Sequence, residues 1–122
     1  MTEPYCSQVR SLYMVELVVA DWPASIMWYR DLFGRAPALT DVGGQFALFE
    51  IGGNRLALKA GAPQPGNSLI VFEVADLPGL LARLAAQQVI SEELIEASPE
   101  GYRRAVVRDL DGHRLCLFEW QR

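Results

Sequence analysis

The sequence predicts an α+β fold made of two tandem copies of one β-α-β-β-β unit. The segment VADWP (residues 19–23) recurs 55 residues later as VADLP (74–78). A second pair, GNRLAL (53–58) and GHRLCL (112–117), differs at two of its six positions and is offset by 59 residues. Two near-matches in the same order favour an internal duplication over a chance recurrence of common strand and turn dipeptides.

The first unit begins with a strand over residues 13–20, which is rich in β-branched side chains. Asp21 is suited to cap a helix, and Pro23 fits the first helical turn, where its missing N–H costs nothing. The apolar spacing predicts a helix to about Phe33, ended by Gly34. Three short strands follow, the first two joined through a pair of glycines. They cover residues 37–42, 45–51 and 55–60.

The second unit repeats this order after a Pro- and Gly-rich break, GAPQPGNS, over residues 61–68. A strand is predicted over 68–75, and Asp76 and Pro78 then open the second helix. Three strands complete the unit, the last of them after an Asp-Gly turn. They cover residues 93–97, 102–109 and 114–120.

The length of 122 residues fits one compact domain. Hydrophobic residues make up 51% of the chain and charged residues 21%, as in an ordinary globular protein. We expect an N-terminal segment over 1–10 and a single domain over 11–122. Within this domain, the first module covers 11–60, the linker 61–67 and the second module 68–122.

Composition also narrows the function. A formal net charge of −4 argues against nucleic acid as a partner, and it would favour a cationic ligand, although solubility alone is the commoner reason for such acidity. No stretch approaches the roughly 18–20 apolar residues of a membrane span, and the start of the chain lacks a secretion-signal pattern. Cys6 and Cys116 match neither a metal-binding spacing nor a disulfide framework, so we expect a cytoplasmic protein with both thiols reduced.

Two local motifs accompany the repeat. The first helix carries an acidic cap, a serine, an aromatic-Tyr pair and a terminal glycine, and the second motif is the turn DLDGH over residues 109–113. The helix positions are Asp21, Ser25, Trp28, Tyr29 and Gly34. With the tandem units, these motifs resemble the vicinal oxygen chelate superfamily, which contains glyoxalases, bleomycin resistance proteins and extradiol dioxygenases. In the turn, Leu110 and His113 replace the Pro and Asn usual in that family.

The resemblance implies two curved, four-stranded mixed sheets around a cleft, with helices on the outer faces. Alternation along the strands agrees with a helix-covered core face, because every second residue is apolar. These residues are Val15, Leu17, Val19, Leu56, Leu58, Ile70, Phe72, Val74, Leu115 and Leu117. The opposite face mixes apolar and charged side chains, which suits a ligand cleft and equally a partly solvated sheet.

Metal-dependent members of this superfamily place His, Glu or Gln at four strand positions, two in each module. By the motif, these positions hold Met14, Ala57, Leu69 and Cys116 here. None is a ligand that hard or borderline divalent cations prefer, and the soft donors Met14 and Cys116 would make a poor Cu(I) site. The only histidine, His113, cannot form a site alone. We therefore expect no catalytic metal and no cofactor.

Other side chains of the mixed face are candidates for ligand binding. Glu16 and Glu73 could transfer protons, or they could form ordinary cross-strand pairs with basic neighbours. Trp120 offers a flat surface for an aromatic ligand, and Phe49 and Arg108 occupy positions that match under the repeat offset. The complete set of cleft candidates is Met14, Glu16, Phe49, Arg55, Ala57, Leu69, Glu73, Arg108, Arg114, Cys116, Phe118 and Trp120.

Three functions remain open at this point. The first is a metal-free protein of the bleomycin-resistance type that sequesters a small aromatic or cationic molecule. The second is an enzyme of the same superfamily, with a displaced metal site or with acid-base chemistry at Glu16 and Glu73. The third is a scaffold whose cleft is filled by its own side chains. The resemblance also implies a homodimer, in which modules pair within one chain or between two chains, and no membrane or nucleic-acid partner is expected.

Overall fold

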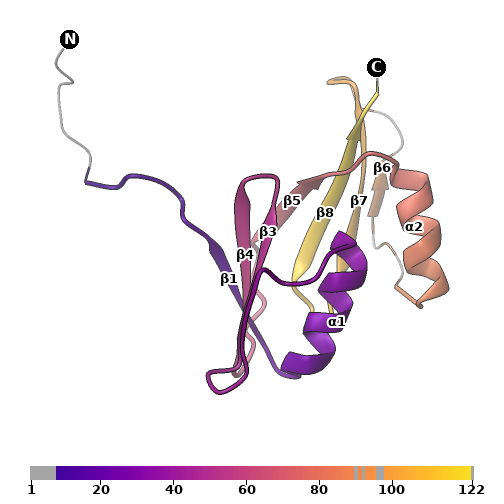
Figure 1. The fold of residues 1–122 in the computed structure, drawn as a ribbon. Helices are drawn as coiled ribbons and strands as arrows, with labels where there is room; N and C mark the ends of the chain where they lie inside the picture. Colours follow the sequence, from indigo (N-terminus) through magenta and orange to yellow (C-terminus); the bar gives the residue numbers. More distant parts are fainter. Residues whose placement is uncertain (1–7, 90, 92, 96–97, 122) are drawn as a thin grey trace, which may run out of the picture.

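The structure is a computed structural model that describes residues 8–89, 91, 93–95 and 98–121. Cys6 and the end of the strand predicted over 93–97 lie outside these residues. The first module contains β1 (Val15–Val19), α1 (Trp22–Phe33), β2 (Leu39–Asp41), β3 (Phe46–Ile51) and β4 (Asn54–Ala60). The second contains β5 (Leu69–Glu73), α2 (Leu77–Ala86), β6 (Glu93–Ile95), β7 (Tyr102–Arg108) and β8 (Arg114–Trp120). This order confirms the α+β class with two β-α-β-β-β units (Figure 1).

Each module forms one four-stranded mixed sheet. The strand orders are β1-β4-β3-β2 and β5-β8-β7-β6. In each module the strand that comes first along the chain pairs in parallel with the strand that comes last, β1 with β4 and β5 with β8. The other pairs are antiparallel. The long crossover that a parallel pair requires is supplied by the helix and the two strands that follow it. The described residues include no helix that could span a membrane.

Local chemistry explains where the helices begin and end. The Asp21 carboxylate accepts a hydrogen bond from the Ala24 N–H at 3.0 Å, and Asp76 caps α2 in the same way. Gly34 ends α1 at φ 68°, in the left-handed conformation that glycine adopts without steric cost. At the start of α1, the Trp22 indole Nε1 donates to the Leu58 carbonyl at 3.2 Å, which fixes the helix on β4.

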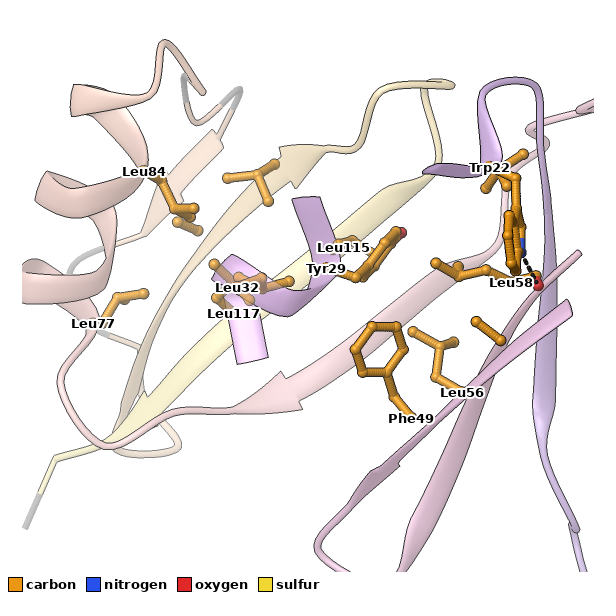
Figure 2. Close-up of a cluster of buried hydrophobic side chains, with 14 residues drawn as sticks. Trp22, Tyr29, Leu32, Phe49, Leu56, Leu58, Leu77, Leu84, Leu115 and Leu117 are labelled. Carbon is orange, nitrogen blue, oxygen red and sulfur yellow. Dashed lines mark hydrogen bonds between the residues drawn. The ribbon is translucent and has the colours of Figure 1, made fainter. Parts of the chain in front are cut away.

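The core is one cluster to which both modules contribute (Figure 2). The apolar face predicted from alternation lies within it or packs directly against it, as expected. Helix α1 covers its own sheet and also reaches the second one. The ring of Phe33 lies 5.2 Å from that of Phe49 in β3 and 5.5 Å from that of Phe72 in β5. In addition, Arg83 of α2 donates to the Leu32 carbonyl of α1.

Because both sheets pack against α1, only one face of each sheet is left without a helix. Since the core faces of both sheets pack against the same helix, the opposite faces lie on the outside of the corner that the sheets form (Figure 1). We call these helix-free faces the outer faces. The helices lie on the inner side of the corner, not on the outside as the resemblance implied. Within one chain the outer faces do not face each other. The modules contact each other through α1 and the shared core, and residues of β1 and β5 line a cavity beside this contact.

Candidate functional site

The four positions that hold metal ligands in metal-dependent relatives lie two on each outer face. Ala57 is fully buried between Glu16 and Leu48, its neighbours in register on β1 and β3. Cys116 is 1% exposed, and its neighbours in register are Val71 and Val106. Met14 and Leu69 are half-buried. None of the four side chains carries a nitrogen or oxygen donor, so they do not fit the divalent metal that the family places there.

Three predicted residues from the two modules meet around one cavity. This space, which we call the seam cavity, has a volume of about 540 Å³ and lies between β1, the β3–β4 turn and β5. Its walls are mainly apolar, and they include Met14, Val15, Leu56, Ile70, Val71 and Phe72. Arg55 and Glu73 are the charged residues of its lining. The sequence named both as candidates but did not indicate that they share a cavity.

The two charges of the seam cavity have different surroundings. The Arg55 guanidinium lies 4.4 Å from the centre of the Tyr13 ring, and its Nη1 donates to the Tyr13 carbonyl at 3.4 Å. Glu73 is exposed, and among the described residues its carboxylate makes no hydrogen bond or ion pair. Arg55 is thus already held by the segment before β1, whereas Glu73 is available to a ligand.

Further predicted residues form a separate aromatic cluster on the outer face of the second sheet. The rings of Tyr102, Phe118 and Trp120 meet edge to face, with centroids 5.3–6.1 Å apart. Trp120 remains 41% exposed. Sequence reasoning missed Tyr102, although the alternation of β7 would have placed it opposite Trp120. Arg114 lies on the same face beside Leu69.

The prediction that Phe49 and Arg108 occupy equivalent positions in the two modules is wrong. Phe49 is fully buried in the core, opposite Leu56, and the equivalent residue of the second module is Val107, opposite Leu115. The reason is one extra residue in the second hairpin: four residues separate Glu50 from Arg55, but five separate Arg108 from Arg114. A shift of one residue moves a side chain to the other face of a sheet. Arg108 is exposed at the end of β7, where its Nη1 donates to the Gly112 carbonyl at 3.0 Å.

A buried carboxylate organises the loop between β7 and β8, residues 109–113, which we call the latch loop. Asp109 is 8% exposed, and its Oδ2 accepts the Tyr29 hydroxyl at 2.5 Å. Its Oδ1 accepts the N–H groups of Asp111 and His113, both at 2.9 Å. Burial, and then the negative charge of Asp109, hold the pKa of Tyr29 well above its usual value. Tyr29 therefore acts as a neutral phenol that donates.

The latch loop also reaches the junction between β1 and α1. Nε2 of His113 lies 2.8 Å from the Val18 carbonyl, and Asp111 accepts the Ala20 N–H at 3.1 Å. Ligand atoms of Asp109, Asp111 and His113 lie within 4.8 Å of one another, so this group could hold a cation. However, hydrogen bonds already occupy both Asp109 oxygens, and Nε2 of His113 faces a carbonyl. We interpret the latch loop as a structural tie between the modules.

Comparison with known proteins agrees with this architecture. Residues 11–117 match the model of the Glyoxalase/Bleomycin resistance protein/Dioxygenase superfamily. The chain belongs to this superfamily. A search of curated proteins found no significant match.

Solved structures with the same fold include proteins of different activities. A glyoxalase / bleomycin resistance protein from Catenulispora acidiphila is 24% identical, with a TM-score of 0.70 over 89% of this chain and 98% of that one. The fosfomycin resistance protein FosX from Listeria monocytogenes, complexed with Mn(II) and sulfate, is 16% identical, with a TM-score of 0.79 over 93% of both chains. Lactoylglutathione lyase from Agrobacterium tumefaciens is 21% identical, with a TM-score of 0.73 over 93% of this chain and 96% of that one. At these identities the likeness shows the shared fold alone.

Proposed function

We propose that this chain is a cytoplasmic, metal-free binding protein of the bleomycin-resistance type, which sequesters a small organic molecule between its modules. The observation that carries this proposal is the side-chain chemistry at Met14, Ala57, Leu69 and Cys116, where metal-dependent relatives have His, Glu or Gln. Two apolar side chains, a thioether and a thiol cannot replace the imidazole and carboxylate ligands of a divalent ion. A binding role needs no such ion.

A cavity that one of these residues, Met14, lines supports binding. The seam cavity lies within the range of about 300–1,000 Å³ that is typical of small-molecule sites. An open cavity of this size also disfavours a scaffold whose cleft is filled by its own side chains. The exposed aromatic surface of Trp120 offers a further contact on the outer face of the second sheet.

We also propose that the protein works as a homodimer. The outer faces of one chain point away from each other, so a cleft with a sheet on each side requires a second copy. Light scattering coupled to gel filtration measures the mass directly. A dimer is expected, and a monomer at the concentrations used for ligand binding would contradict this part of the proposal.

Elemental analysis of protein purified without chelator, followed by a thermal-shift screen of small organic ligands, tests the proposed function. We expect less than stoichiometric metal and an increase in melting temperature with at least one ligand class. Stoichiometric Ni, Zn, Mn or Fe would overturn the metal-free assignment. A screen in which no ligand stabilises the protein would overturn the binding role.

One observation favours a second candidate function, that of an enzyme. Asp109, Asp111 and His113 form a group of ligand atoms away from the usual positions, as a displaced metal site would require. The alternative carboxylate pair is less well placed, because Glu73 lines the seam cavity and Glu16 does not. Metal that is retained by the wild type and lost in the Asp111→Ala variant would favour this enzyme over the binding protein.

A further inference from the structure

The seam cavity combines an apolar interior with one carboxylate that has no partner. Its walls come from both modules, because β1 and the β3–β4 turn belong to the first and β5 to the second. Apolar side chains such as Val15, Ile70 and Phe72 favour a hydrocarbon or aromatic body in this space. A purely apolar ligand would form no ion pair or hydrogen bond with Arg55 or Glu73. The charge of whichever of these two residues is free to bind therefore predicts the polar group of the ligand.

Of the two charged residues that line the cavity, the acidic one, Glu73, is available to a ligand. Arg55 stacks on the Tyr13 ring and donates to the Tyr13 carbonyl, and such contacts between a cation and an aromatic face are favourable. No ion pair joins Arg55 to Glu73 in the described part of the chain. Glu73 is thus an exposed carboxylate in the lining of the cavity, and the overall net charge of −4 adds to the attraction for a cation.

From this geometry we infer that the seam cavity binds an amine with an apolar body: the body fills the space between β1 and β5, and the ammonium group pairs with Glu73. This inference rests on the proposed binding function and specifies its ligand class. Arg55 remains on Tyr13 and donates to any neutral acceptor of the ligand. The aromatic cluster around Trp120 takes no part in this contact.

Three probes that share one skeleton test the sign of the charge. They are 3-phenylpropan-1-amine, 3-phenylpropan-1-ol and 3-phenylpropanoic acid, titrated into the full chain and followed by calorimetry and by amide chemical shifts. We expect the amine to bind, and the acid to bind roughly fivefold more weakly or not at all, since exposed charge pairs contribute modestly. Equal or tighter binding of the acid would overturn the assignment of Glu73.

Two pairs of matched variants test the location. Val71 is 54% exposed on the cavity wall, whereas Val42 is 74% exposed and does not line the cavity. We expect Val71→Trp to weaken amine binding at least tenfold and Val42→Trp to leave it unchanged. Likewise, Glu73→Gln should lower the affinity for the amine roughly threefold, whereas Glu100→Gln, at an exposed residue that does not line the cavity, should have no effect.

The outcomes separate this inference from the proposed function. If the amine binds and Val71→Trp behaves like Val42→Trp, the seam site is wrong although the protein is a binding protein. If Val71→Trp fails to fold, the Glu73→Gln and Glu100→Gln pair still decides, because both residues are exposed and outside the core. If neither the probes nor the wider screen stabilise the chain, the proposed function itself is wrong.

Discussion

Replacing Tyr29 with phenylalanine removes one hydroxyl group from the interior and leaves the ring in place. In the wild type this hydroxyl donates to the carboxylate of Asp109, a residue that is itself 8% exposed. The variant leaves Asp109 Oδ2 without this donor in a site that water reaches poorly. Hydrogen bonds to charged groups contribute about 1.5–3 kcal/mol, so we expect the free energy of unfolding to fall by about 2 kcal/mol. For a chain of this length, that lowers the melting temperature by roughly 5–10 °C.

Chemical denaturation of Tyr29→Phe at neutral pH measures this loss. Tyr102→Phe is the matched control, because Tyr102 lies on the outer face and its hydroxyl makes no hydrogen bond among the described residues. The control should change the free energy of unfolding by less than about 0.5 kcal/mol. If Tyr29→Phe changed stability no more than Tyr102→Phe, the interpretation of the latch loop as a tie between modules would be refuted.

The pKa of Tyr29, the ring of Phe33 and the backbone of Gly34 each lead to a further prediction. The fold raises the pKa of Tyr29 above its usual 10.0, so the stability that the neutral phenol contributes is fully present below pH 10 and is lost as the pH rises further, by up to about 1.4 kcal/mol per pH unit. Denaturation of the wild type from about pH 9 to 11 should show this fall in the free energy of unfolding, and an equally steep fall in Tyr29→Phe would contradict the prediction. Phe33→Ala should cost about 3 kcal/mol, since its ring joins the two sheets, and Met27→Ala on the exposed side of α1 should cost far less by the same denaturant titration. Gly34→Ala should lower the free energy of unfolding by about 1 kcal/mol, because the φ of residue 34 is positive. A melting temperature equal to that of the wild type would show that α1 does not require glycine at its C-terminal cap.

Much of the fold could be predicted because its signals are local. The caps Asp21 and Asp76 act on N–H groups three residues away, so their position in the sequence marks where the helices begin. Strand alternation depends only on neighbouring residues, and it identified the core face correctly. The repeat then gave the order of the strands.

The errors and omissions concern features that depend on register or on distant contacts. One extra residue in the second hairpin makes Val107 and not Arg108 the equivalent of Phe49, and a count along the sequence cannot show where a hairpin gains a residue. The hydrogen bond between Tyr29 and Asp109 joins residues 80 positions apart, so both looked like ordinary motif residues. The meeting of Arg55 and Glu73 around one cavity depends on how two sheet edges approach, which no local pattern encodes.

The sharing of α1 has a consequence for how the two halves of the chain depend on each other. A fragment that ends before β5 would leave one side of Phe33 without Phe72, and the Tyr29 hydroxyl without its acceptor. The second half alone would lack the helix that covers part of its own apolar face. Although the sequence repeats, we expect that neither copy folds alone and that unfolding is a single cooperative transition in which both modules lose their structure together.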